Sequence, residues 1–144
     1  MSTAKGLNLV YYFSMDRRLI VLITLIVIIV GVTSRVFTIG NVLWDKYLGD
    51  ALYAVLFFLL LSFVWTSGST LIKFIIVFIF IFLIELFQLT GIPQELAGSS
   101  NMAIKLVGIL LGMEFSWWDI VAYGVGLCVI GGVDYYMLRR MNES

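Results

Sequence analysis

Four long apolar segments, separated by short polar stretches, set the pattern of this chain. Each is long enough, at about 1.5 Å of rise per helical residue, to cross or nearly cross a hydrocarbon layer of about 30 Å. The pattern predicts an all-α, polytopic membrane protein with four transmembrane helices in a single membrane domain over residues 1–144. The predicted spans are residues 17–34, 49–65, 71–90 and 117–138.

A fifth apolar segment lies between the third and fourth spans. Asn101 can cap a helix that runs from Met102 to Leu111, and Gly112 can end it. About ten apolar residues cannot cross a bilayer. We therefore expect a short helix that is either re-entrant or lies at the interface.

The composition supports this class and argues against others. Hydrophobic residues make up 62% of the chain and charged residues 12%, which does not suit a soluble fold. The chain has no histidine, and its nine basic and nine acidic residues cancel, so nucleic acid is not an expected partner. No phosphate-binding pattern is present, and we expect neither a cofactor nor a metal. Membrane lipids are the expected partners.

The distribution of Lys and Arg gives an orientation. With four spans, six basic residues fall on the side of the two termini and three fall on the other side. Cytoplasmic segments are enriched in Lys and Arg, so both termini are expected in the cytoplasm. The six are Lys5, Arg17, Arg18, Lys73, Arg139 and Arg140, and the three are Arg35, Lys46 and Lys105.

Glu85 is the most unusual residue of the third span, because it is an ionisable side chain in an otherwise apolar helix. Placing such a charge in a membrane helix costs about 2.5–3.5 kcal/mol on insertion scales. Gln88, three residues later, lies on the same helical face. Glu85 is too far from the helix N-terminus to cap it. Two interpretations remain open: a ligand site, or a buried ion pair with Arg35 that holds two helices together.

The other polar residues of the spans lie near the same, non-cytoplasmic end. Asp50 and Tyr53 share one face in the second span, and Asp119 and Tyr123 share one face in the fourth. These positions predict an outward-facing polar pocket. Its predicted ligand-binding residues are Arg35, Asp50, Tyr53, Glu85, Gln88, Asp119 and Tyr123.

Simpler roles exist for several charges. Asp50 and Asp119 lie at predicted helix starts, where a carboxylate stabilises the helix dipole by about 0.3–1 kcal/mol. Several carboxylates close together cannot all be ionised without compensation, so we expect one proton to be shared or retained. Asp45 and Lys46, which open the second span, also fall at the non-cytoplasmic end. The alternative for four charges is that they are simply solvated loop residues: Asp45, Lys46, Glu95 and Glu114.

Three short motifs follow one another along the chain. They are Gly49-Asp50-Ala51-Leu52-Tyr53, then Ile84-Glu85-Leu86-Phe87-Gln88, then a Phe-x-Trp-x-Asp-x-x-Ala-Tyr-x-x-Gly pattern from Phe115 to Gly126. With this ordered set, the chain resembles the VanZ-like family of small bacterial membrane proteins. It resembles more closely an uncharacterised bacterial family of the same size that has these motifs. The resemblance covers about residues 17–138.

The VanZ-like pattern is matched in part. Gly49 stands where that pattern has His, Tyr123 stands where it has Asn, and no arginine lies between Gln88 and Asp119. The resemblance implies a role in the cell envelope and a location in the bacterial cytoplasmic membrane. The matching residues are Asp45, Lys46, Tyr53, Glu85, Gln88, Asp119 and Gly126.

The favoured hypothesis is a pocket that binds a lipid headgroup or a lipid-linked envelope precursor. Arg35 would contact an anionic group, and the carboxylates and Gln88 would bind hydroxyl, amine or cation groups. One alternative is an enzyme acting on a headgroup, with the carboxylates as general acid and base or as ligands of a divalent cation. A second alternative is proton or ion transport, which needs a polar path to the cytoplasmic side. For such a path the inner halves of the spans offer only Lys73 and Asp134, near the edge.

Overall fold

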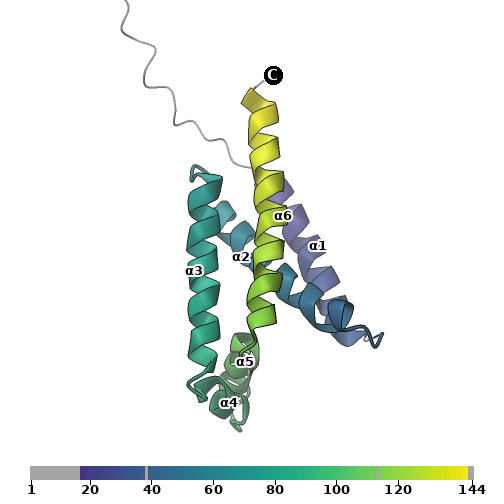
Figure 1. The fold of residues 1–144 in the computed structure, drawn as a ribbon, viewed down its shortest axis with the longest axis vertical. Coiled ribbons are helices and arrows are strands. Elements are labelled where there is room, and N and C mark those ends of the chain that lie inside the picture. Colours follow the sequence, from purple (N-terminus) through teal and green to yellow (C-terminus); the bar gives the residue numbers. More distant parts are fainter. Residues whose placement is uncertain (1–16, 38, 113, 143–144) are drawn as a thin grey trace, which may run out of the picture.

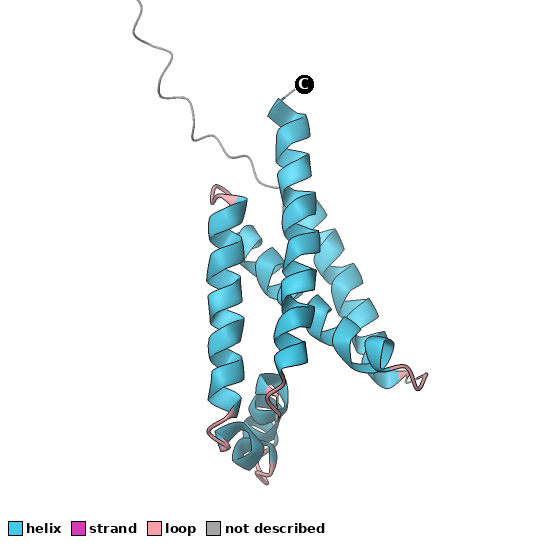
Figure 2. Cartoon of the chain, viewed as in Figure 1, coloured by secondary structure: helices cyan, strands magenta, loops and turns pink. Residues whose placement is uncertain are grey.

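The computed structural model of the protein describes residues 17–37, 39–112 and 114–142. Throughout these ranges the regular structure is helical (Figure 2), which confirms the predicted all-α class. The helices are α1 (Arg17–Val36), the π-helix η1 (Leu43–Tyr47), α2 (Leu48–Val64), α3 (Thr70–Gln88), α4 (Ile92–Ala97), α5 (Met102–Leu111) and α6 (Trp117–Asn142).

Four helices are long and apolar enough to cross a membrane, as the sequence pattern predicts. They are Arg17–Ser34, Leu43–Val64, Thr70–Gln88 and Trp117–Met137. The second is longer than its predicted range, because η1 continues directly into α2. The Asn41 side chain accepts a hydrogen bond from the N–H of Leu43 at 2.9 Å, so helical structure begins several residues before Gly49.

α2 and α6 form the centre of the bundle. α1 packs mainly on α2, and α3 packs on both α2 and α6. Figure 1 shows α1 on the side of the bundle away from α3, with α4 and α5 gathered below the lower ends of α3 and α6. The C-terminal end of α6 lies at the opposite, upper end. The lower end of the bundle is therefore covered by α4 and α5, whereas the upper end carries the C-terminal end of α6.

The buried face of α3 changes from polar to apolar and back to polar along its length. Its buried residues recur every three or four positions, as expected for one helical face. Val77 and Ile81, in the middle, pack in the apolar core with Phe58, Leu59 and Leu127. Polar residues lie at both ends of the stripe, so the bundle has two buried polar regions separated by an apolar layer. The full stripe is Lys73, Val77, Ile81, Glu85 and Gln88.

The upper polar region joins α3 to α6. Thr70 Oγ1 donates a hydrogen bond of 2.5 Å to Asp134 Oδ2, and Asp134 and Lys73 are both fully buried. Lys73 and Glu85 are about 18 Å apart along α3 at the helical rise of 1.5 Å per residue. The lower polar region, around Glu85, is therefore separate from this one.

The segment after α3 forms two short helices. α5 has the predicted bounds: Asn101 Oδ1 accepts from the N–H groups of Ala103 and Ile104, and Gly112 ends the helix with a φ of +83°. α4 is not predicted by the sequence pattern. It begins after Gly91, whose φ of +76° turns the chain, and Pro93 occupies its first turn, where a missing N–H costs nothing.

α4 and α5 pack backbone against backbone at Gly108. A Cβ at this position would lie 2.3 Å from the Ala97 N and 2.7 Å from the Pro93 O. Gly108→Ala is therefore expected to push the two helices apart, at a cost of about 1–3 kcal/mol. Gly98→Ala is the matched control, because its Cβ would meet nothing closer than 3.5 Å. Thermal unfolding in detergent measures both variants, and equal midpoints would contradict this packing.

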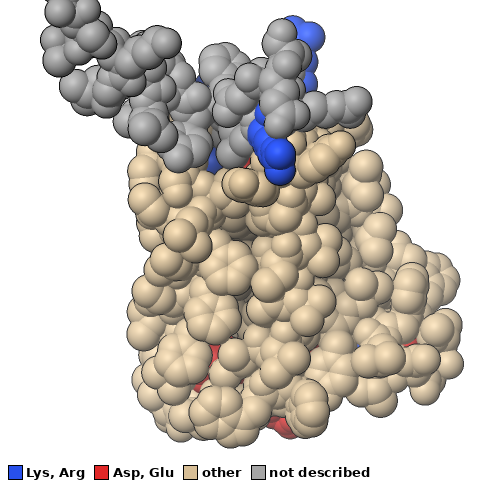
Figure 3. Space-filling model, turned by 45° about the horizontal axis from the view of Figure 1, so that its top comes forward, with Lys and Arg blue, Asp and Glu red and all other residues tan. Residues whose placement is uncertain are grey.

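The outer faces of the long helices are apolar. Figure 3 shows a wide band of uncharged side chains, with basic side chains gathered towards the upper end. On α1, for example, Leu22, Leu25 and Ile29 are each more than half exposed. Contiguous apolar surface of this extent suits contact with lipid. The structure thus has the surface of a membrane protein.

Candidate functional site

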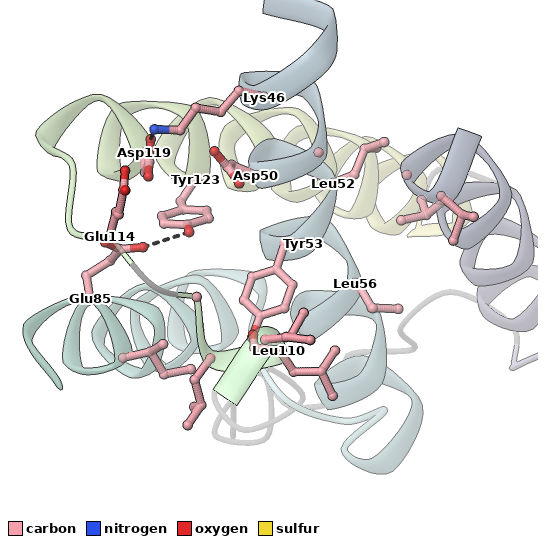
Figure 4. A pocket seen from close by; sticks show the side chains of 18 of the residues that line it. Lys46, Asp50, Leu52, Tyr53, Leu56, Glu85, Leu110, Glu114, Asp119 and Tyr123 are labelled. Carbon is pink, nitrogen blue, oxygen red and sulfur yellow. Dashed lines mark hydrogen bonds and ion pairs between the residues drawn. The ribbon is translucent and has the colours of Figure 1, made fainter. Parts of the chain in front are cut away.

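A cavity of about 580 Å³ lies in the lower half of the bundle. Residues of η1, α1, α2, α3, α5 and α6 line it. Its volume is within the range of about 300–1,000 Å³ that is usual for small-molecule sites. Figure 4 shows polar side chains from several helices pointing into it.

Six of the seven predicted binding residues line this one cavity. They come from α2, α3 and α6, which confirms that these helices converge at one end. The seventh, Arg35, belongs to α1, but its side chain lies outside the described part of the structure, so a pair between Arg35 and Glu85 stays a prediction. The six lining residues are Asp50, Tyr53, Glu85, Gln88, Asp119 and Tyr123.

Glu85 lies at the centre of the polar residues and is only 1% exposed. Its Oε1 accepts hydrogen bonds from Tyr123 Oη at 2.7 Å and from Gln88 Nε2 at 3.4 Å. Oε2 makes no hydrogen bond of ordinary geometry to a described residue, although the Ser116 backbone N–H lies close enough to interact with the Glu85 carboxylate. An unfilled buried acceptor costs about 1–3 kcal/mol, more if charged. Oε2 is thus a place where a donor from outside the chain would bind favourably.

Gln88 and Tyr53 hold the C-terminal end of α5 against the cavity. Gln88 Nε2 donates to the Leu111 O at 2.8 Å, and Tyr53 Oη donates to the Leu110 O at 3.4 Å. The last carbonyls of a helix have no partner within it, so these side chains satisfy groups that would otherwise be open. The short helix therefore covers one side of the cavity.

Lys46 is absent from the predicted site, yet it lines the cavity. Its Nζ lies 3.1 Å from Asp119 Oδ1, with side-chain exposures of 44% and 7%. Of the two alternatives for Lys46, the solvated loop charge does not hold, because η1 makes this stretch helical and places Lys46 one turn before Asp50. Asp45 is not simply solvated either: its Oδ1 accepts the N–H of Ile39 at 2.9 Å and closes the preceding loop.

Helix capping does not explain Asp50. The helix that carries it begins with η1 at Leu43, and Tyr47, at the N-cap position of α2, makes no side-chain cap. Asp50 is 6% exposed and interacts electrostatically with Lys46. Asp119 does lie in the first turn of α6, where the helix dipole favours it in addition to Lys46.

The wall opposite these groups is apolar and comes mainly from α1. Its residues recur at helical spacing, which places them on one face. Ile109 and Leu110 of α5 continue this apolar surface. The sequence pattern does not predict the wall, because an apolar residue facing a cavity looks the same in sequence as one facing lipid. The α1 residues are Val27, Ile28, Gly31, Val32 and Val36.

The charged lining is mostly acidic. Among the described side chains, Lys46 is basic, whereas Asp50, Glu85, Glu114 and Asp119 are acidic. Glu114 thus lines the cavity, although the sequence pattern treats it as a loop charge. Within the described residues, no three His, Cys, Asp or Glu side chains are arranged to hold a metal ion. The cavity is rich in hydrogen-bond acceptors that are not gathered into a metal site.

Comparison with known families decides where the chain belongs. A family described as "Protein of unknown function (DUF2809)" matches residues 39–127, which is more than half of the 144 residues. The chain belongs to the DUF2809 family. No solved structure matches it.

The DUF2809 match contains the whole polar part of the cavity. Its residues run from Lys46 to Tyr123, all within 39–127, whereas the α1 wall lies before the matched region. The family description assigns no activity. The role of this DUF2809 protein is therefore argued from the chemistry of the cavity.

Removing the hydroxyl of Tyr123 is expected to destabilise the protein. Tyr123→Phe removes the 2.7 Å hydrogen bond to the buried Glu85, and bonds to charged groups contribute about 1.5–3 kcal/mol. Tyr53→Phe is the control, because it removes a longer bond, 3.4 Å, to a neutral carbonyl. Unfolding midpoints in detergent should fall more for Tyr123→Phe. A larger fall for Tyr53→Phe would show that Glu85 does not depend on Tyr123.

Proposed function

We propose that this protein binds an amphiphile, either a membrane lipid or a lipid-linked precursor of the cell envelope. The headgroup would occupy the polar part of the cavity, and a hydrocarbon chain would lie along the α1 wall. One observation carries the proposal: the same cavity joins a polar side, built by η1, α2, α3 and α6, to an apolar wall built by α1. A ligand with two such ends matches this arrangement.

The polar side would supply most of the selectivity. A hydrocarbon chain gains little by moving from lipid onto an apolar helix, because the two surroundings are equally apolar. Polar groups in a membrane protein, by contrast, bind strongly to complementary groups, since leaving them unpaired is costly. The headgroup is therefore the part of the ligand that the cavity would distinguish.

The apolar middle of the bundle favours binding over transport. Between Glu85 and Lys73, the buried residues of α3 are Val77 and Ile81. These pack in the apolar core and offer no hydrogen-bonding group to a moving ion. A ligand in the cavity would accordingly stay on one side of the bundle.

We propose the bacterial cytoplasmic membrane as the location, with the cavity in its outer half. Arg17 and Arg18 at the start of α1 and Arg139 near the end of α6 support a cytoplasmic upper end. The resemblance to VanZ-like proteins supports an envelope role. In this proposal the ligand reaches the cavity from the outer leaflet.

Photo-crosslinking in vesicles tests the proposal. The probe is a diacyl phospholipid with a diazirine in its acyl chain, added to vesicles of unlabelled phospholipid that contain the full chain. Labelling of the α1 wall should reach a plateau as the probe fraction rises, because a binding site there becomes fully occupied. Labelling of lipid-facing residues such as Ile79 and Leu83 should keep rising in proportion. Labelling of the wall that never saturates, or that is absent, would contradict the proposal.

A further inference from the structure

We propose that the headgroup bound by this cavity carries a primary ammonium group, which Glu85 and Gln88 recognise. This inference rests on the proposed binding function and names the chemistry of its ligand. It predicts selectivity for aminated amphiphiles, such as those with a phosphoethanolamine headgroup, over those whose headgroup has only hydroxyl groups.

With Glu85 ionised, the open polar atoms of Glu85 and Gln88 are both acceptors. Glu85 Oε2 and Gln88 Oε1 make no hydrogen bond of ordinary geometry to a described residue, and these side chains are 1% and 6% exposed. The Ser116 backbone N–H also interacts with the Glu85 carboxylate, but it leaves acceptor capacity there. Both residues line the cavity. Acceptors can be satisfied only by donors, so the part of a ligand that reaches them must present N–H or O–H groups.

The orientation of the Gln88 amide follows from its partner. The Leu111 O lies 2.8 Å from the atom assigned as Nε2, and a backbone carbonyl only accepts hydrogen bonds. The nitrogen must therefore face Leu111, which leaves the oxygen as the open atom. Gln88 cannot offer a donor to the ligand while it holds α5.

Charge distinguishes an ammonium group from a hydroxyl. Among the described lining side chains, Lys46 is basic and four are acidic, and Lys46 is ion-paired with Asp119 rather than with Glu85. An ammonium group brings three donors and a positive charge in one compact unit, whereas a hydroxyl brings one donor and no charge. Asp119 adds a second negative charge near Glu85, which favours an ammonium group over a neutral hydroxyl.

Lys46 suits the anionic part of the same headgroup. Its side chain is 44% exposed although it pairs with Asp119, so it can also meet a phosphate. Lys46 belongs to η1, before α2, whereas Glu85 belongs to α3 and is buried. A zwitterionic headgroup would thus find acceptors for its amine and a cation for its phosphate in one cavity.

Three phospholipids with identical acyl chains test the inference. Their headgroups are phosphoethanolamine, phosphocholine and phosphoglycerol, and native mass spectrometry of the full chain in detergent gives the dissociation constants. The ethanolamine lipid should bind about tenfold more tightly than the glycerol lipid, as expected for one charge-assisted contact. In Glu85→Gln this preference should fall to about twofold or less, whereas Glu85→Asp should retain part of it.

The outcomes separate the inference from the proposed function. Gly31→Phe serves as the blocked-cavity variant, because Gly31 lines the cavity and a Cβ there meets nothing closer than 3.9 Å. Equal binding of all three lipids that Gly31→Phe abolishes would overturn the ammonium inference and leave the proposed function standing. Equal binding of the ethanolamine and choline lipids would show that charge without N–H donors suffices, and would also overturn it. If none of the three lipids binds in a way that Gly31→Phe abolishes, both the ammonium inference and the proposed function are overturned.

Discussion

Gly126→Ala is expected to lower the free energy of unfolding by about 1–3 kcal/mol, and Gly126→Leu is expected to prevent the bundle from assembling. α6 crosses α2 at this glycine. A Cβ at position 126 would lie 2.2 Å from the Ala51 O and 2.9 Å from the Ala51 C. Both are backbone atoms, so no side-chain rotation relieves the overlap and the two helices must separate.

The same crossing positions the cavity. Ala51 follows Asp50, and Gly126 is one turn after Tyr123, so separating α2 from α6 also moves these two lining residues apart. Lipid binding should therefore fall together with stability. Gly124→Ala is the control on the same helix, because a Cβ there meets nothing within 4 Å. Thermal unfolding in detergent compares the two variants, and a Gly126→Ala protein as stable as Gly124→Ala would refute this crossing.

The double variant Glu85→Met with Tyr123→Phe is expected to lose headgroup selectivity while keeping its stability. The change removes both partners of the 2.7 Å hydrogen bond together with the open Oε2. Replacing both partners by apolar groups of similar shape is often neutral or stabilising, unlike removing one of them. The unfolding midpoint should thus equal or exceed that of the unchanged protein and lie above that of Tyr123→Phe alone.

This outcome distinguishes a binding role for Glu85 from a structural one. If Glu85 mainly holds helices together, the double variant should lose about 3–5 kcal/mol, as when one partner of a buried ion pair is removed. The unfolding midpoint in detergent measures stability, and the lipid dissociation constants measure headgroup selectivity. Both are determined on one preparation. A strongly destabilised double variant would support the structural interpretation.

The sequence predicts the helices and most of the polar site for physical reasons. Helix periodicity alone places Glu85 with Gln88, and Asp119 with Tyr123, on common faces. Successive spans cross the membrane in opposite directions, so a count of four spans predicts which helix ends lie on the same side. An ionisable residue inside an apolar helix is costly, so its position in the sequence is informative by itself. All six of the predicted binding residues whose side chains the structure describes do line one cavity.

The parts that the sequence does not predict depend on local backbone geometry and on packing. Lys46 joins the site because η1 makes its segment helical, and no residue pattern identifies a π-helix before α2. The α1 wall consists of apolar residues that look like any lipid-facing surface. The role of α5 follows from two backbone carbonyls, at Leu110 and Leu111, which side-chain patterns do not reveal.

Lipid retention by Gly31→Phe tests the central claim most directly. Gly31 lines the cavity, and within 4 Å a Cβ there would meet only the Leu52 side chain, so the added ring is expected to occupy the cavity from the α1 wall. Gly132→Phe is the matched control, because position 132 is exposed and has nothing within 4 Å of its Cβ. Native mass spectrometry of phosphoethanolamine lipid bound per chain should show one saturable site in the unchanged protein and in Gly132→Phe, and none in Gly31→Phe. Equal saturable binding in Gly31→Phe and Gly132→Phe would contradict a ligand site in this cavity.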